Sequence, residues 1–283
     1  MSLGLSLSGG GVKGAAHIGV LKAFEENNIK IDYIGGTSSG SIVATLYAAG
    51  FTPDEIYNIF KKYCKKIKYV DFKNIIKLIF GLITTGTIVI DGLNSGKSIE
   101  KLINKVCEAK GIKNISDLKM PLVIPSVDMN SGEVVCFTSK KFRTFSNNTI
   151  FVHDINIGKA VQASCSFPVV FSPCDYRNKS LLDGGIRENT PWREVELLGA
   201  DKVISVIFEN AVDKTCCKNL IDVAFRSFDL MKKELAKYEE NGMGYSIKIK
   251  SEKVSLLDMS KIDYFYELGY EETKKFLIKP IDK

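Results

Sequence analysis

A serine stands at the centre of Gly36-Thr37-Ser38-Ser39-Gly40, which matches the pattern G-x-S-x-G. A short apolar stretch precedes the pattern and a run of small residues follows it, which is the strand-turn-helix context of a nucleophile elbow. Glycine is required at positions 36 and 40 because a side chain there would collide with the tightly turned backbone. The amino terminus of the following helix favours developing negative charge. The pattern therefore predicts that Ser38 is a nucleophile for acyl transfer, and the alternative is an ordinary Gly/Ser turn.

A serine hydroxyl is a weak nucleophile without a base, and the usual base is histidine. The chain has only two histidines, His17 and His153, and both precede the best acidic candidate, Asp183. The order serine, acid, histidine of the α/β-hydrolases is therefore impossible. The order His17, Asp32, Ser38 would crowd the whole triad into one short stretch. A histidine-based triad is poorly supported, and we expect His17 to be a packed residue of a helix.

Asp183 lies in Leu181-Leu182-Asp183-Gly184-Gly185. Two apolar residues, an acid and two glycines indicate a strand that ends in a sharp turn. Such a turn would place the carboxylate at a sheet edge, where other backbone can approach closely. The alternative is a plain Asp-Gly turn, which is common.

A third segment is rich in glycine and runs from Ser8 to Gly14 with the sequence SGGGVKG. Consecutive glycines that lead into a helix expose backbone N–H groups to an anion. In an acyl hydrolase that anion is the tetrahedral oxyanion.

Three stretches together resemble the patatin-like phospholipases: SGGGVKGAAHIGVLKAFEE, GGTSSGSIVATLYAAG and LLDGGIRENTP. That family has a G-x-G-x-x-G oxyanion loop, a G-x-S-x-G nucleophile and a D-G-G or D-G-A base motif. The three patterns fall here, in order and without gaps, at Gly9, Gly11 and Gly14, at Gly36, Ser38 and Gly40, and at Asp183, Gly184 and Gly185. The stretch ASCSFPVVFSP resembles the family's segment before the base motif, and the likeness covers about residues 3 to 200.

The resemblance implies a lipid acyl hydrolase, of phospholipase A or lysophospholipase type, with a Ser-Asp dyad and no histidine. Ser38 would be acylated and then released by water, with Asp183 accepting the serine proton. The Gly10 and Gly11 amides, with Lys13 nearby, would hold the oxyanion. The substrate would be a lipid or lysolipid, and we expect no cofactor and no metal. A free aspartate has a pKa of about 3.9, so this base needs a short contact and a partly desolvated site.

Two nucleotide-binding patterns compete with this interpretation. The series Gly9, Gly11 and Gly14 also fits a dinucleotide fingerprint, with Asp32 about twenty residues further on. That acid should lie at the far end of the second strand, whereas Asp32 begins it. Residues 91–98 end in GKS, but a P-loop needs glycine where Asp91 stands. A non-catalytic lipid-binding protein remains a further alternative if Ser38 is unreactive.

The elements around these residues predict an α/β fold. Strands at 3–7 and 33–35 alternate with helices at 12–27 and 39–49, which is typical of a parallel sheet covered by helices. The resemblance implies the three-layer patatin-like form of this fold. Further helices are expected from the Thr52 cap onward and at 95–109, 154–165 and 220–240, with strands at 122–127, 134–138 and 203–208. We expect a catalytic domain at 3–200 with a helical cap insertion at 53–93, and residues 201–283 completing the same domain.

The charge of the chain is concentrated in one place. Residues Lys61 to Lys77 hold seven lysines and one acid, which accounts for the whole net charge of +6. This argues against a nucleic-acid footprint and for one basic surface. The apolar stretch Leu78 to Ile90 follows at once, so we expect peripheral contact with anionic membrane. The alternative is a solvated helix face followed by a core strand.

Seven cysteines, an odd number without a C-x-x-C pair, disfavour a disulfide framework and fit a reducing compartment. The first residues lack the basic region of a signal peptide, and the longest apolar run falls short of the roughly 20 residues of a membrane span. We therefore expect a cytoplasmic protein. The adjacent Cys216 and Cys217 are expected to be ordinary thiols.

Overall fold

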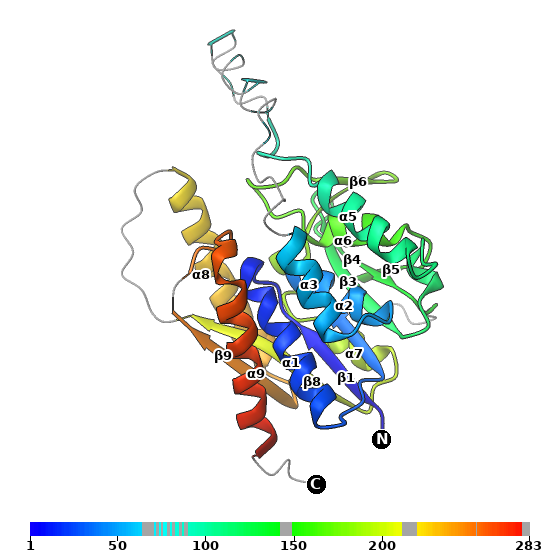
Figure 1. Cartoon of the computed structure of the whole chain (residues 1–283). Coiled ribbons are helices and arrows are strands. Elements are labelled where there is room, and N and C mark those ends of the chain that lie inside the picture. Colours follow the sequence, from blue (N-terminus) through cyan, green and yellow to red (C-terminus); the bar gives the residue numbers. More distant parts are fainter. Residues whose placement is uncertain are drawn as a thin grey trace.

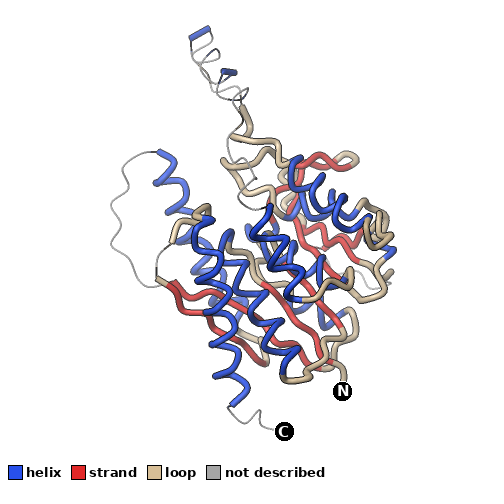
Figure 2. Tube along the Cα trace, in the orientation of Figure 1, coloured by secondary structure: helices blue, strands red, loops and turns tan. Residues whose placement is uncertain are grey.

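The structure is a computed structural model that describes residues 1–63, 71, 74, 76–77, 80, 83–84, 87, 90–141, 149–210, 220–252 and 254–278. A central sheet lies between helices on both faces, as Figures 1 and 2 show. Its strands follow the order β5-β4-β3-β2-β1-β8-β9, and β7 joins β3 to β6. The predicted α/β class with a mostly parallel, helix-covered sheet is confirmed.

The strands of the sheet are β1 (Leu3–Leu7), β2 (Tyr33–Gly36), β3 (Leu122–Asp128), β4 (Val134–Thr138), β5 (Thr149–Val152), β6 (Cys174–Tyr176), β7 (Lys179–Asp183), β8 (Lys202–Asn210) and β9 (Tyr245–Ser251). The central strands β3, β2, β1, β8 and β9 run parallel to one another. β4 and β7 are antiparallel to β3, so the sheet is mixed on the side of β3. Strands covered on both faces are expected to be continuously apolar, and β3 is buried along its whole length.

The helices are α1 (Ala15–Glu26), α2 (Ser39–Ala48), α3 (Pro53–Tyr63), α5 (Lys97–Glu108), α6 (Ile157–Ser164), α7 (Trp192–Leu197), α8 (Leu220–Glu240) and α9 (Ile262–Ile278). The larger core cluster joins the sheet to α1, α2, α5, α6 and α9. A smaller cluster packs Trp192 and Val195 of α7 against the opposite face. The two clusters form the two interfaces of a three-layer protein.

Close packing of α1 on α9 depends on two glycines. A Cβ on Gly19 would collide with the backbone of Tyr266, and one on Gly269 would collide with the backbone of Ala16. The two helix axes can approach closely only because both positions lack a side chain. This contact fixes α1, and therefore the glycine loop that precedes it.

The first helix of the expected cap segment packs on the body. α3 begins at the predicted Thr52 cap, where Thr52 and Glu55 exchange side-chain-to-backbone hydrogen bonds of 2.8 and 3.2 Å. Its Ile56 and Phe60 are buried in the larger core cluster, against α1 and α2. Most of residues 64–89 lie outside the described part, so the cap itself stays a prediction.

The sequence did not reveal β5, β6, β9, α7 or α9. β9 pairs with β8 and α9 packs on α1, so residues beyond 200 extend the same sheet and the same core. Cys216 and Cys217 lie outside the described residues. Within the described part, the four cysteines Cys107, Cys136, Cys165 and Cys174 are buried free thiols.

Candidate active site

Ser38 occupies a sharp turn between β2 and α2. Its backbone angles are φ 53° and ψ −123°, a region that non-glycine residues seldom adopt. A Cβ on Gly36 would collide with the backbone of Gly40, and one on Gly40 would collide with the Leu7 carbonyl. Glycine at both positions therefore permits the turn, as the pattern predicted.

Neighbouring hydroxyl groups hold the turn in this conformation. The Ser38 amide donates to Ser164 Oγ at 3.0 Å, and Ser41 Oγ donates to the Ser38 carbonyl at 2.6 Å. Thr37 Oγ1 donates to the Glu188 carbonyl at 2.9 Å. The strained serine is thus tied to α6, to α2 and to the segment after β7, and surrounding structure of this kind is what a strained residue needs in order to persist.

Asp183 is the last residue of β7 and is almost completely buried, with 2% of its surface exposed. Its amide donates to the Ser166 carbonyl at 3.0 Å, and its Oδ1 accepts from the Gly185 amide at 2.8 Å. Its Oδ2 is buried and has no hydrogen-bond partner of standard geometry within the described residues. A Cβ on Gly184 would collide with the Pro125 carbonyl, so the turn after Asp183 lies directly against β3.

Burial raises the pKa of the Asp183 carboxyl above its ordinary value. The Ser38 hydroxyl, the charge of Lys232 and the Gly185 amide act in the opposite direction. The hydroxyl has the largest of these three effects. The turn that carries Ser38 lies against the turn after Asp183, because a Cβ on Gly184 would stand 3.1 Å from Thr37 Cγ2. A carboxylate that is stripped of water and lies beside a serine hydroxyl can accept its proton, even where the contact in the free protein is loose.

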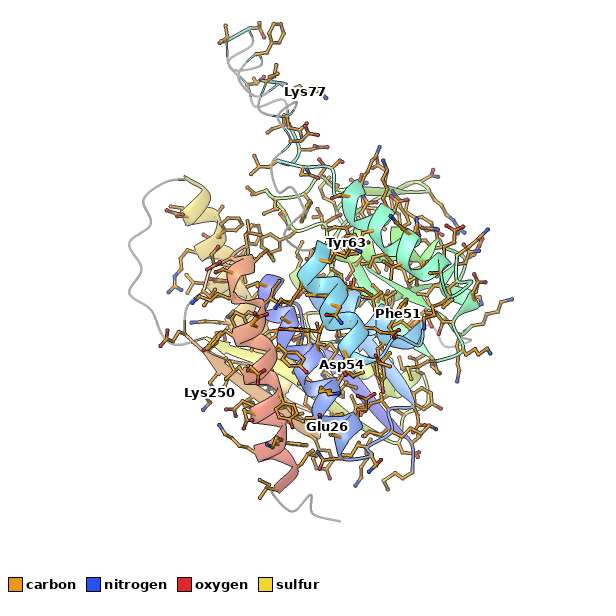
Figure 3. The ribbon with its side chains drawn as sticks, in the orientation of Figure 1. Glu26, Phe51, Asp54, Tyr63, Lys77 and Lys250 are labelled. Atoms are coloured by element: carbon orange, nitrogen blue, oxygen red, sulfur yellow. The ribbon has the colours of Figure 1, made fainter. Side chains whose placement is uncertain are left out.

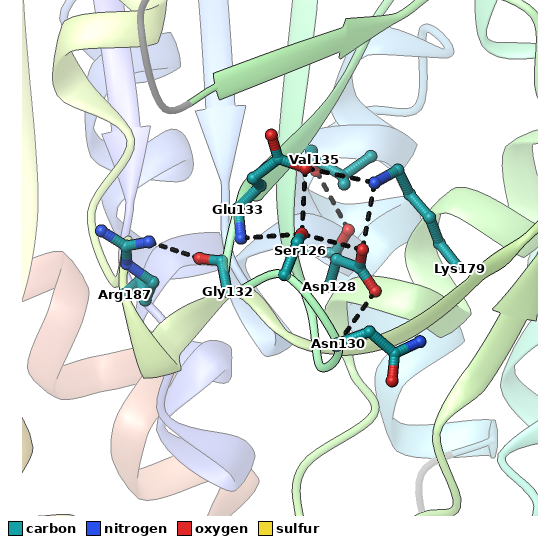
Figure 4. A network of polar contacts seen from close by, with 9 residues as sticks. Ser126, Asp128, Asn130, Gly132, Glu133, Val135, Lys179 and Arg187 are labelled. Carbon is teal, nitrogen blue, oxygen red and sulfur yellow. Dashed lines mark hydrogen bonds and ion pairs between the residues drawn. The ribbon is translucent and has the colours of Figure 1, made fainter.

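A network of ion pairs anchors the strand that carries Asp183 (Figure 4). Lys179 of β7 contacts Asp128 at 3.0 Å and Glu133 at 3.3 Å, both in the β3–β4 hairpin. Arg187, beyond the base motif, donates to the Gly132 carbonyl of the same hairpin. Both ends of the base segment are therefore fastened to β3 and β4.

The glycine loop lies between β1 and α1, against the serine turn. Gly11 has φ 60° and begins a short 3-10 helix, Gly11–Gly14, that continues into α1. A Cβ on Gly9 would stand 3.1 Å from the Ser38 Cβ, and one on Gly14 would stand 2.7 Å from the Ser39 Cβ. The structure thus brings Gly9 and Gly14 next to the serine turn, where the sequence pattern expected an oxyanion loop.

The amides of this loop have different partners. Gly9 N–H donates to the Asn189 carbonyl at 3.2 Å and Gly10 N–H donates to Ser39 Oγ at 3.1 Å. Within the described residues the Gly11 amide has no hydrogen bond. The Gly10 amide is therefore bonded to a side-chain hydroxyl that can rotate away, and the Gly11 amide is an unused donor among the described residues.

Lys13 is 3% exposed and its Nζ lies 5.9 Å from the centre of the Phe208 ring. Burial lowers its pKa to about 8; Asp229 opposes that shift, and Lys232 and Lys233 add to it. The group is therefore charged at neutral pH, close to its point of titration.

Within the described residues, neither histidine contacts a carboxylate. His17 Nε2 lies 2.7 Å from the Ser8 carbonyl, and His153 Nδ1 lies 3.0 Å from the Thr138 carbonyl. His17 is fully buried, and burial lowers its pKa to about 4, against a small opposing effect of the Ser8 carbonyl. His17 is thus the packed helix residue that the sequence predicted, and it fastens α1 to the end of β1.

The two nucleotide-binding patterns do not form nucleotide sites. Asp32 precedes β2 at the opposite end from the glycine loop, and its Oδ2 accepts from the Leu3 amide at 3.1 Å. In the GKS segment, the amides of Leu93 and Asn94 donate to Val169 and Val170 carbonyls. These donors are used inside the protein and are not available to a phosphate. No group of three or more His, Cys, Asp or Glu side chains able to hold a metal occurs in the part of the chain that is described.

Sequence reasoning missed three residues that surround the dyad candidates. Ser164 accepts from the Ser38 amide, and Asn189 accepts from Gly9 and donates to Glu239 Oε1 at 2.8 Å. Lys232 of α8 acts electrostatically on Asp183. Ser164 and Asn189 stood inside stretches that resembled the family, but Lys232 is distant in sequence and only the fold brings it near.

A buried α/β sheet with a strained serine at a strand-helix turn defines a serine hydrolase-like architecture. The patatin-like phospholipase family model matches residues 5–195. The chain therefore belongs to the patatin-like phospholipase family, and this membership supports a hydrolase of carboxylic esters in lipids.

Individual relatives agree with this assignment. The chain is 29% identical over 215 residues to the lysophospholipase NTE1 of Lodderomyces elongisporus, covering 76% of this chain but 13% of that protein. It is 30% identical over 195 residues to the uncharacterized protein YqhO of Bacillus subtilis, covering 65% and 63% of the two chains. The fold resembles that of VipD from Legionella pneumophila, with a TM-score of 0.54, 16% identity, and coverage of 98% and 66%. Among the helices described, none has both the length and the hydropathy of a membrane span.

The buried His17 predicts a loss of stability in acid. The unfolded chain binds a proton near pH 6.5, whereas the folded protein binds it only near pH 4. Stability is therefore complete above pH 6.5 and falls as the pH drops toward 4, by about 3 kcal/mol for this group. His17→Gln keeps a donor for the Ser8 carbonyl and cannot titrate, so it should lose less stability than the wild type between pH 7 and pH 4.5 in urea unfolding.

His153→Asn is the matched control, because it replaces the other histidine of the chain and leaves the buried contact of His17 with the Ser8 carbonyl in place. Equal losses in the wild type and in His17→Gln would contradict the assignment of the effect to His17.

Proposed function

We propose that the chain is a lipid acyl hydrolase that uses Ser38 as nucleophile and Asp183 as base. The observation that carries the proposal is the strained Ser38, whose turn lies against the turn of a buried carboxylate, and among the described residues the Oδ2 of this carboxylate has no hydrogen-bond partner. Two features support the proposal: a half-buried serine on a strained turn and a desolvated carboxyl group that can take its proton.

In the first step the Ser38 Oγ attacks the ester carbonyl carbon and its proton passes to Asp183 Oδ2. The negative charge that develops on the carbonyl oxygen is stabilised by the Gly10 and Gly11 amides and by the amino terminus of α2. Collapse of the tetrahedral intermediate breaks the ester C–O bond, and the leaving alcohol takes the proton from Asp183. Water then repeats the sequence on the acyl-enzyme and frees Ser38 and a fatty acid.

An aromatic cluster beside the dyad supports a substrate with an acyl chain. Phe167 directly follows Ser166, whose carbonyl accepts from the Asp183 amide. Its ring lies 5.9 Å from Phe225 and 5.5 Å from Phe228, both on α8. Because the relatives in fungi are named lysophospholipases, a lysophospholipid is the first substrate to test.

Ser38→Ala should abolish labelling by a fluorophosphonate probe, because the probe reacts with an activated serine hydroxyl. Ser38→Gly should also be unlabelled and should be at least as stable as Ser38→Ala, since glycine relieves the strain of φ 53°. In-gel labelling and thermal unfolding measure the two effects. Persistent labelling of either variant would refute the nucleophile assignment.

Asp183→Asn should lower turnover about a thousand-fold or more on a lysophospholipid or p-nitrophenyl ester, because the amide cannot accept the serine proton. Replacing both His17 and His153, in a variant shown to be folded, should reduce turnover far less. An equally inactive, folded double variant would show that a histidine is the base.

The same proposal includes docking on anionic membrane through residues 61–77. Lys61 and Lys62 lie in the last turn of α3, and Lys77 projects from the body in Figure 3. Close to it in sequence, Ile76, Phe80 and Ile83 are 52, 66 and 78% exposed. Exposed apolar side chains beside lysines are what an interfacial surface requires.

Replacing Lys61, Lys62, Lys65 and Lys66 with glutamine should reduce co-sedimentation with phosphatidylserine vesicles. The free energy of membrane binding should weaken by about 1 kcal/mol for each lysine that reaches the membrane surface. Binding should fall as salt rises and should be absent with neutral vesicles. A control variant with the same charge change at Lys30, Lys250, Lys274 and Lys275, all exposed elsewhere, should bind like the wild type. An equal loss of vesicle binding in both variants would show that binding depends on net charge alone and would contradict docking through residues 61–77.

A further inference from the structure

Lys232 lies in the middle of the inner face of α8. Phe225, Phe228, Lys232 and Glu239 recur at spacings of three, four and seven residues, so they share one side of the helix. The two phenylalanines contact Phe167, and Glu239 accepts from the Asn189 amide. The face that carries Lys232 is therefore the face packed on the catalytic segments, which is an unusual place for a lysine.

The ammonium group rests on the loop that follows Asp183. Its Nζ would be 3.6 Å from a Cβ on Gly185, and the same Cβ would be 3.0 Å from Asp183 Oδ1. Nζ and Oδ1 are thus separated by no more than the sum of these distances, which is close for two opposite charges. Gly185 has no side chain to intervene between them.

Lys232 has no closer partner that would account for its position. Within the described residues it forms no hydrogen bond and no ion pair. The other charged groups that act around it are Glu239 on its own helix and Lys13 of the glycine loop. The remaining groups that act around Asp183 are neutral: the Ser38 hydroxyl before α2, the Gly185 amide and the buried Cys165 thiol after α6. Among the described residues Lys232 is therefore the charge that acts on the candidate base.

A buried base faces two opposing requirements. Removal from water makes the carboxylate a stronger base, but it also favours the protonated form, which cannot accept the serine proton. Catalysis is best when the pKa of the base lies near the working pH, and a nearby cation restores the ionised form without exposing the group to water. On Asp183 burial is the larger effect, and in the described part of the chain Lys232 is the charge that opposes it.

We propose that Lys232 is a positioning residue of this hydrolase, which holds Asp183 in its ionised form from the far side of the Gly185 turn. The proposal rests on the Ser38–Asp183 dyad proposed above. Lys232 neither forms nor breaks a bond with the substrate, and its effect is exerted through Asp183 alone.

The test is the pH dependence of kcat/KM on p-nitrophenyl butyrate, an uncharged ester, so that no contact with a substrate phosphate contributes. In the wild type kcat/KM should fall on the acidic side of the profile as Asp183 takes up a proton, and we call this fall the acidic limb. In Lys232→Met and Lys232→Gln the acidic limb should shift to higher pH by roughly one unit or more, and activity should recover toward the wild-type value at high pH. At pH values below the limb this corresponds to a loss of about tenfold. Lys232→Arg keeps the charge and should restore the wild-type limb.

Two matched variants separate this effect from others. Lys237→Met removes an exposed lysine from the same helix and should leave the limb in place. Glu239→Gln removes a second buried carboxyl on which Lys232 acts and whose pKa is raised to about 7, chiefly by burial. If Glu239→Gln abolishes the limb, the titrating group is Glu239 and the proposal fails.

A uniform loss of activity at all pH values in folded Lys232→Met and Lys232→Gln would show a structural role and overturn the proposal, as would an unchanged limb. Fluorophosphonate labelling of Ser38 in the wild type is independent of these outcomes. A failure at Lys232 with intact labelling therefore rejects only the tuning role, whereas absent labelling rejects the dyad itself.

Discussion

The whole site depends on the close contact between the end of β1 and the first turn of α2. Gly40 lies directly against the Leu7 carbonyl, and Gly14 lies against the Ser39 side chain. These contacts place the amides of the glycine loop beside Ser38 before any substrate arrives. Because β1 and β2 are neighbouring parallel strands, the distance between the glycine loop and Ser38 is set by the sheet and does not depend on how a loop folds.

Residues near one another in sequence made much of this site predictable. Small residues and glycines around Ser38 indicated a tight turn, and a strand, helix, strand, helix order indicated a parallel sheet. The Thr52 cap could be found because its partner Glu55 lies three residues away. In each of these cases the determinant is a local backbone or side-chain requirement, which a single sequence displays directly.

The rest of the site arises from contacts between distant segments. β7 is short and is fixed by its pairing with the distant β3, while its hairpin partner β6 has only three residues, so the sequence indicated only the end of β7. The helical pattern of α8 was visible, but its spacing says nothing about what its inner face meets. The seating of Lys232 beside Gly185 follows from the packing of α8 on the base loop, which no local pattern encodes. α9 was not predicted. Gly19 on α1 permits the close contact with α9, but the sequence does not show which segment makes that contact.

The hydrogen bond from the Gly10 amide to Ser39 Oγ has a thermodynamic consequence for the resting protein. A donor aimed at an empty space would be solvated by water, and an incoming carbonyl oxygen would have to displace that water. Here the side chain after the nucleophile occupies the donor instead, and one torsional rotation of Ser39 can release it. If Gly10 has the proposed oxyanion role, binding of the substrate oxygen is an exchange of acceptors, and the free energy gained is only the difference between a hydrogen bond to a neutral hydroxyl and one to a charged oxygen. In the proposed reaction such an exchange would gain little for a ground-state ester and more for an alkoxide, so the amide would favour the transition state.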